Sequence, residues 1–184
     1  MSSVSVSTTK FIVYACPTGQ FNSLLEDYFR QSLKLYGENT AHKYMPHCTL
    51  TGFFTADIDS IPIYIQALDL AYTEAKNENL PLDITVKQLT FNENWHGLEL
   101  QGENLKQLIV DFSGVEKAIA YREKLRLKDW LHLSLAYNFA PQHNKKLEHL
   151  ARDTIDIEVK NDWELRFYQK NPDWSWNCLK SWQL

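Results

Sequence analysis

Two short stretches, Pro46-His-Cys-Thr-Leu50 and Leu131-His-Leu-Ser-Leu135, repeat one pattern: a histidine, an apolar residue, a hydroxyl residue and a second apolar residue. Both lie in β-prone runs, 47–54 and 131–139, and side chains alternate between the two faces of a strand. Each histidine should therefore share a face with the hydroxyl two positions on. The apolar residues should face the core, and these are Cys48, Leu50, Leu133 and Leu135.

The rest of the chain alternates between strand-like and helix-like runs. Further β-prone runs predict strands at 11–15, 82–91, 95–101, 164–169 and 175–182. Apolar residues at helical spacing predict helices at 24–33, 61–75 and 105–112, and Pro141 opens a fourth. A similar order of elements precedes each histidine strand, and no linker divides the chain. We therefore expect one α+β domain, 1–184, of two pseudo-equivalent lobes, with residues 1–9 frayed.

The composition indicates a soluble globular protein, because 44% of the 184 residues are hydrophobic and 23% are charged. No stretch has the roughly 18 apolar residues of a membrane span, and the N-terminus lacks the apolar core of a secretory signal. We expect a cytoplasmic monomer without a membrane partner. The net charge of −4 lacks the basic excess that binding along a nucleic acid requires, so long nucleic acids are disfavoured partners.

Other patterns that carry chemistry are weak. The three cysteines, Cys16, Cys48 and Cys178, are widely spaced without a CxxC pair, so we expect mostly buried thiols and no zinc site. The chain has no GxxxxGK[ST], GxSxG or HExxH motif, which excludes the usual P-loop, serine-hydrolase and zinc-protease patterns. We expect neither a metal nor a cofactor. Four further histidines lie in polar surroundings and are expected on the surface: His42, His96, His143 and His149.

Two imidazoles facing one phosphodiester suit its hydrolysis. Histidine titrates near neutral pH, so one ring can accept a proton from water while the other donates a proton to the leaving oxygen. Thr49 and Ser134 can then donate hydrogen bonds to the non-bridging oxygens as charge builds on the pentavalent transition state. A single His-x-Thr/Ser tripeptide arises by chance roughly once in such a chain, so the prediction depends on the pair. The alternative is two half-buried structural histidines.

The paired motifs resemble those of the two-histidine phosphoesterase superfamily, and the flanking sequence is most similar to the plant and fungal cyclic nucleotide phosphodiesterase branch. The similarity spans almost the whole chain. It includes the opening strand at 13–17, the proline before His47, the extension of the second motif to Tyr137, and a Trp-rich C-terminal strand. The resemblance implies a bilobal fold in which two antiparallel sheets line a central cleft, with helices outside.

The same resemblance implies metal-independent hydrolysis of a nucleoside 2',3'-cyclic phosphate or ADP-ribose 1'',2''-cyclic phosphate to a phosphomonoester. The implied catalytic residues are His47, Thr49, His132 and Ser134. Tyr137 corresponds to a tyrosine that helps hold the phosphate. In a regular strand, however, the Tyr137 side chain would lie on the opposite face from His132, so a twist or bulge at Ala136 is required. Tyr14 stands where similar enzymes have a tryptophan beside the substrate, and it can stack on a base or be a core aromatic.

Two alternative functions use the same cleft. An RNA-end-processing enzyme of the superfamily, of the 2'-5' ligase or exonuclease type, would need a basic apron, and only Lys124, Arg126 and Lys128 form such a cluster. A non-catalytic nucleotide-binding module would not need both histidines and both hydroxyls.

Two further assignments complete the prediction. From the resemblance, His132 is the base that activates water and His47 the acid that protonates the leaving sugar oxygen. The tryptophans of the β-prone runs and the C-terminal hairpin are expected to pack in the sheet, and these are Trp95, Trp174 and Trp176.

Overall fold

The computed structural model describes residues 8–114 and 125–184, so Lys124 of the basic cluster lies outside the described residues. The strands are β1 (Thr8–Thr18), β2 (Cys48–Thr49), β3 (Phe54–Asp57), β4 (Thr85–Phe91), β5 (Trp95–Gln101), β6 (His132–Tyr137), β7 (Asp162–Lys170) and β8 (Trp176–Gln183). The α-helices are α1 (Gly19–Tyr36), α2 (Ile61–Asn77), α3 (Glu103–Ser113) and α4 (Asn144–Thr154). Short 3₁₀ helices are η1 (Thr40–Lys43), η2 (Ile58–Ser60) and η4 (Pro141–His143). The predicted α+β class is confirmed.

The described strands form one antiparallel sheet in the order β4-β5-β6-β2-β1-β7-β8, with β3 also paired to β1. The two sheets expected for the two lobes are thus hydrogen-bonded into one. The junction is the pairing of Cys48 in β2 with Leu133 in β6. Each of these residues directly follows a motif histidine, and opposed residues of antiparallel strands lie about 5 Å apart. One residue pair therefore sets the two motifs side by side in opposite directions.

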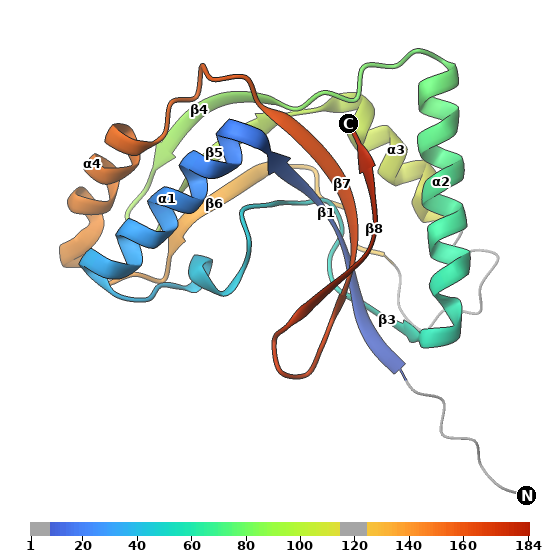
Figure 1. Ribbon diagram of the computed structural model, residues 1–184, viewed down its shortest axis with the longest axis horizontal. Helices are drawn as coiled ribbons and strands as arrows, with labels where there is room; N and C mark the ends of the chain where they lie inside the picture. The colour runs from blue at the N-terminus through green and yellow to red at the C-terminus, as the bar shows by residue number, and fades with distance from the viewer. Residues whose placement is uncertain (1–7, 115–124) are drawn as a thin grey trace, which may run out of the picture.

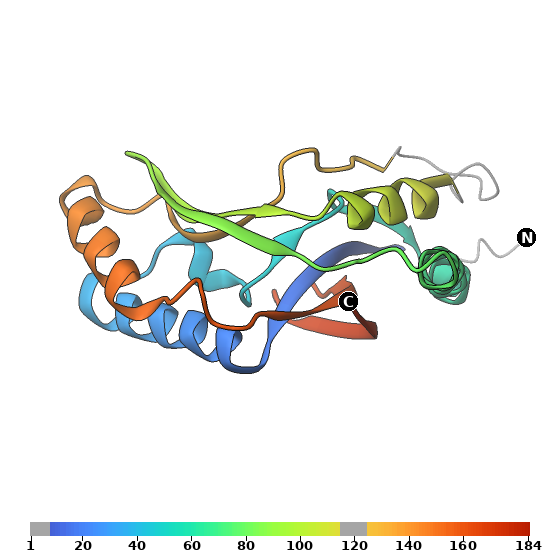
Figure 2. The ribbon, with the colours of Figure 1, turned by 90° about the horizontal axis from the view of Figure 1, so that it is seen from above.

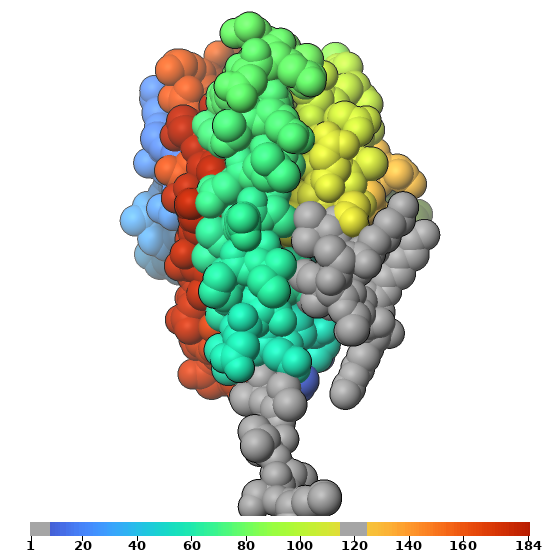
Figure 3. Space-filling view, turned by 90° about the vertical axis from the view of Figure 1, so that its right-hand side faces the viewer, coloured from blue at the N-terminus to red at the C-terminus, as the bar shows by residue number. Residues whose placement is uncertain are grey.

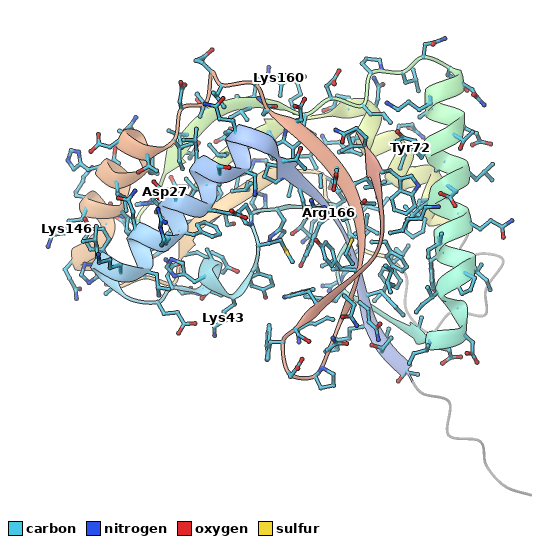
Figure 4. The ribbon with its side chains drawn as sticks, in the orientation of Figure 1. Asp27, Lys43, Tyr72, Lys146, Lys160 and Arg166 are labelled. Atoms are coloured by element: carbon cyan, nitrogen blue, oxygen red, sulfur yellow. The ribbon has the colours of Figure 1, made fainter. Side chains whose placement is uncertain are left out.

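The α-helices lie in two pairs at opposite ends of the molecule, with the strands running between them (Figures 1 and 2). Helix α1 contacts α4 at one end and α2 contacts α3 at the other. Figure 3 shows α2 across the middle of its face of the molecule, with α3 on one side and β8 on the other. In Figure 4 the labelled Tyr72 extends from α2 toward β8, where its hydroxyl donates a hydrogen bond to the Gln183 carbonyl at 2.6 Å.

The alternation of side chains along β1 separates two hydrophobic clusters. Phe11, Val13 and Ala15 belong to the large core that the sheet forms with the helices. Ile12, Tyr14 and Cys16 belong to a smaller cluster on the other face of the sheet, together with Tyr168 of β7. The second face therefore has polar and aromatic side chains free of the main core.

The strand predicted at 47–54 is interrupted after Thr49. The Thr51 hydroxyl accepts a hydrogen bond from the Val13 backbone N–H at 3.1 Å, which replaces a backbone acceptor of the ladder. Gly52 then donates its N–H to the Arg126 carbonyl at 2.6 Å instead of to β1. The chain rejoins β1 as β3, which pairs as far as Thr8. For this reason β1 begins at Thr8 rather than after a frayed segment reaching residue 9.

The structure describes the state of the three cysteines and the character of the helices. Cys16 and Cys48 are buried, Cys178 is exposed, and all three thiols are free. Among residues 8–114 and 125–184, no helix has the length and apolar character needed to cross a bilayer.

Candidate active site

Both histidine motifs open into one cavity of about 320 Å³, a size within the usual range of small-ligand pockets. The motif residues that line it are His47, Thr49, His132, Ser134 and Tyr137. The remaining lining residues are aromatic or apolar, and they are Phe29, Ala41, Tyr44, Met45, Trp95 and Trp130. No carboxylate is among these residues, so the site suits a negatively charged ligand better than a cation.

The strands direct these side chains as the alternation predicts. The four apolar motif residues lie in the main core and are at most 2% exposed: Cys48, Leu50, Leu133 and Leu135. The two histidines and the two hydroxyl residues are half-buried and face the cavity. The predicted facing of both motifs is confirmed.

Tyr137 reaches the cavity because β6 contains a bulge. Opposite β5, Gly97 pairs with Ser134 and the preceding His96 pairs with Ala136, so Leu135 is an extra residue on β6. Leu135 and Ala136 are both buried, so the alternation of side chains between the two faces of β6 shifts by one residue at this point. Tyr137 consequently shares the face of Ser134. The bulge that the sequence requires near Ala136 is confirmed.

Both histidines are oriented by the same backbone device. The Nδ1 of His47 lies 2.7 Å from the Met45 carbonyl, and the Nδ1 of His132 lies 3.3 Å from the Trp130 carbonyl. A carbonyl only accepts hydrogen bonds, so Nδ1 must carry the proton in each pair. The Nε2 atom of each neutral ring is therefore the one left to accept or return a proton.

Burial lowers the pKa of both catalytic candidates. The His47 ring packs against Tyr14, with ring centroids 4.0 Å apart, and near Tyr44, and burial lowers its pKa to about 4. The Met45 carbonyl opposes this shift, whereas the charge of His132 adds to it. Burial also lowers the pKa of His132, against the Trp130 carbonyl and together with the charge of Lys128. A bound phosphate would raise both pKa values, because an anion favours the protonated ring.

Trp95 is part of the site rather than a plain packing residue. Its indole N–H donates a hydrogen bond to the Ser134 Oγ at 2.9 Å. The Ser134 hydroxyl, which can both accept and donate, thus keeps its own proton for another acceptor. Gly97 makes room for this arrangement, since a Cβ there would lie 2.2 Å from the Trp95 ring. A glycine inside a strand is unfavourable, and this Trp-x-Gly spacing is the sequence signal for the close approach.

Trp130 and Tyr44 are site residues that sequence reasoning missed. The Trp130 ring is 51% exposed and stacks on His132, with ring centroids 4.1 Å apart and planes inclined by 26°. Tyr44 follows η1 and lines the cavity beside His47. Neither residue belongs to a motif, and the loops that bring them to the site depend on the tertiary fold.

Tyr14 is placed beneath the site. Its side chain is 1% exposed and packs against the His47 ring on the face of the sheet away from the main core. Burial raises the pKa of its hydroxyl. Tyr14 also lines a cavity that adjoins the first one, so both roles considered for it, stacking on a base and packing as a core aromatic, stay predictions.

The expectation that four histidines lie on the surface holds only for His149, which is exposed. His96 is 0% exposed between the rings of Phe91 and Phe139, so its prediction is wrong. His42 is half-buried, with its Nε2 2.9 Å from the Ser32 Oγ, and its Nδ1 accepts a hydrogen bond from the backbone N–H of Asn39, the N-cap of η1. His143 is partly buried against a tyrosine ring. Polar neighbours in sequence do not determine burial, because strands and caps turn a single residue inward.

The C-terminal tryptophans differ from each other. Trp174 is 53% exposed, and the Lys170 ammonium lies 3.6 Å from its ring centroid, so the packing prediction is wrong there. Trp176 packs against Phe53 and Tyr44 and fits the prediction. In the part of the chain that the structure describes, no group of three or more His, Cys, Asp or Glu side chains is placed to hold a metal ion.

The chain has the α+β fold of LigT. The crystal structure of E. coli LigT in its apo form superposes with a TM-score of 0.52, covering 97% of this chain and 98% of LigT at 11% identity. At that identity the similarity establishes the fold alone. No family model matches the sequence.

Sequence similarity connects the chain to larger animal proteins. It is 31% identical over 171 residues to ecdysteroid-phosphate phosphatase of Bombyx mori, and the alignment covers 89% of this chain and 25% of that protein. It is 30% identical over 166 residues to ubiquitin-associated and SH3 domain-containing protein B of Homo sapiens, which covers 88% of this chain and 25% of that protein. The chain thus spans about a quarter of the length of these curated relatives.

Proposed function

We propose that this chain is a two-histidine phosphoesterase that hydrolyses a nucleoside 2',3'-cyclic phosphate, or ADP-ribose 1'',2''-cyclic phosphate, to a phosphomonoester without a metal. The observation that carries the proposal is the pair His47 and His132, which enter one cavity from adjacent strands with each Nδ1 fixed by a carbonyl. The LigT fold and the paired motifs support membership of the two-histidine superfamily.

The proposed reaction needs two proton transfers. One neutral imidazole takes a proton from the water that attacks phosphorus, and the other, protonated, gives its proton to the sugar oxygen as the P–O bond to that oxygen breaks. Hydroxyl protons of Thr49, Ser134 and Tyr137 are available to the non-bridging oxygens, where negative charge grows in the transition state. Exchange with solvent then restores the starting protonation of both rings.

The environment of His47 favours it as the base, which reverses the assignment taken from the resemblance. With a pKa of about 4, His47 is neutral at pH 7 in nearly every free molecule. A neutral imidazole can act as the base, which accepts a proton, but not as the acid, which must donate one. His132, beside the exposed Trp130, is then the acid.

The test is turnover of a substrate panel in excess chelator. It contains nucleoside 2',3'-cyclic phosphates, ADP-ribose cyclic phosphate, a cyclic-phosphate-ended RNA and an ecdysteroid phosphate, with products identified. We expect the small cyclic phosphates to be the best substrates. Activity that vanishes with EDTA and returns with a divalent ion would contradict the mechanism.

The same panel separates the alternatives. Preference for the RNA end would indicate an RNA-processing enzyme, and preference for the ecdysteroid phosphate would indicate a monoesterase. Tight nucleotide binding without turnover, measured by calorimetry, would indicate a non-catalytic module.

A further inference from the structure

A second cavity of about 210 Å³ adjoins the first on the His47 side. The two cavities share Tyr44, His47, Thr49 and Tyr137 in their walls. A ligand held between the histidines can therefore extend past Thr49 into the second cavity. The walls of the two cavities thus form one continuous surface.

The second cavity is cationic. Arg126 and Lys128 both line it, and no carboxylate is among its lining residues. The ion pairs found among residues 8–114 and 125–184 include neither of these two cations. Asp129 lines a different hollow, on the other side of Lys128. Two such cations beside the proposed phosphate site stand out in a chain of net charge −4.

Backbone contacts fix the segment that carries these cations. Lys128 donates its N–H to the Leu50 carbonyl at 3.2 Å, and the Gly52 N–H bonds the Arg126 carbonyl. Thr51 forms a β-bridge with Leu127 between them. The Arg126 side chain lies over Gly52, where an added Cβ would be 3.1 Å from its Nε. Both cations are thus tied to the segment between β2 and β3 that follows Thr49.

We propose that Arg126 and Lys128 bind a second phosphate of the substrate, one that is not hydrolysed. This inference rests on the proposed function and narrows its substrate class to cyclic phosphates that carry a further phosphate group. A guanidinium can bind two phosphate oxygens at once, and an ammonium adds a point charge beside it. The further phosphate is either a terminal phosphate on the same nucleotide or the linkage to a neighbouring nucleotide.

The experiment compares three substrates that share one cyclic end. They are a nucleoside 2',3'-cyclic phosphate, the same compound with a 5'-phosphate, and a dinucleotide whose linkage supplies the only further phosphate. We expect a KM at least about tenfold lower for a substrate with a further phosphate than for the nucleoside 2',3'-cyclic phosphate alone, at similar kcat, since hydrogen bonds between charged groups strengthen substrate binding. The Arg126→Gln/Lys128→Gln enzyme should lose this preference while still hydrolysing the nucleoside 2',3'-cyclic phosphate that has no further phosphate.

Lys146→Gln is the matched control, because Lys146 lines neither cavity. It lies on α4, far from the β7–β8 hairpin (Figure 4). This variant should keep the preference. A preference for only one of the two phosphate-bearing substrates still supports the subsite and identifies the source of the phosphate. Equal KM values for all three, or a preference that survives in the double variant, would overturn it.

Calorimetry keeps this inference separate from the proposed function. A nucleoside 3',5'-bisphosphate should bind at least about tenfold more tightly than the 3'-monophosphate, and only when Arg126 and Lys128 are present. This result without turnover would refute the proposed hydrolysis and retain the subsite. Equal binding of the two ligands would refute the subsite.

Discussion

The two histidine motifs have the same backbone geometry and different surroundings. In both, the imidazole is held by the carbonyl two residues before it. The first motif is packed on tyrosines: His47 lies between Tyr14 and Tyr44, and no hydrogen bond of the Thr49 side chain is found among the described residues.

The second motif is surrounded by tryptophans: Trp130 stacks on His132, and Trp95 bonds Ser134. The near-symmetric pair of motifs thus becomes asymmetric through the residues around it. Burial disfavours the protonated form of His47, and the indole N–H of Trp95 fixes the hydroxyl of Ser134 but not that of Thr49.

The largest effect should come from removing either histidine. His47→Ala or His132→Ala should each lower kcat by about two to four orders of magnitude, the contribution of one general acid or base. If both act in one step, the double variant should be little slower than either single one. Steady-state kinetics of the three variants measures this, and multiplicative losses would show that the rings do not act as a unit.

A leaving group that needs no proton should separate the two roles. A p-nitrophenyl phosphodiester releases a phenolate that departs unaided, so an enzyme lacking only its acid should recover much of the lost rate. We expect His132→Ala to be rescued far more than His47→Ala. Measuring both variants on both substrates decides the matter, and stronger rescue of His47→Ala would restore the assignment suggested by the resemblance.

The hydroxyls should contribute less than the rings. Thr49→Ala and Ser134→Ala should each cost about 2–4 kcal/mol, if each removes one preorganised donor to developing charge. The loss should appear mainly in kcat. Thr49→Ser and Ser134→Thr are the matched controls, since they keep the hydroxyl. A change confined to KM would make the hydroxyls ground-state binders.

The pH dependence should reflect the two lowered pKa values. The base must be neutral, so kcat/KM should decrease on the acid side, at pH values below about 4. The acid must be protonated, so kcat/KM should also decrease on the basic side, and this decrease should begin below the ordinary histidine pKa of 6.5. On each limb the fall is about tenfold per pH unit. The two apparent pKa values belong to the pair of rings. An optimum above pH 7 in kcat/KM would contradict this prediction.

The smallest effect should come from the indole of Trp95. Trp95→Phe keeps an aromatic ring and removes the indole N–H, which should slow turnover by a factor between about two and ten, the equivalent of one hydrogen bond. The loss should be absent in the Ser134→Ala background, because the bond acts through that hydroxyl. Trp174→Phe, outside both cavities, is the control. Equal losses in both backgrounds would mean that Trp95 acts by packing alone.

The local geometry of the site follows from the amino-acid sequence alone. Strand alternation is a property of the backbone, so the facing of His47, Thr49, His132 and Ser134 followed from their spacing. The same parity showed that Tyr137 requires a bulge, and the bulge is there. The helices and the C-terminal hairpin were also predictable, because apolar spacing reports which residues a helix or strand can bury.

The surroundings of the two motifs depend on the tertiary fold. The pairing of Cys48 with Leu133, which joins the two halves in one sheet, is a contact between residues far apart in sequence. So are the approach of Trp95 to Ser134 and the position of Arg126 over Gly52. Such contacts depend on how the whole sheet twists and pairs, which no local pattern records. The environment that lowers the pKa of His47 arises in the same way, because burial is a property of the assembled fold.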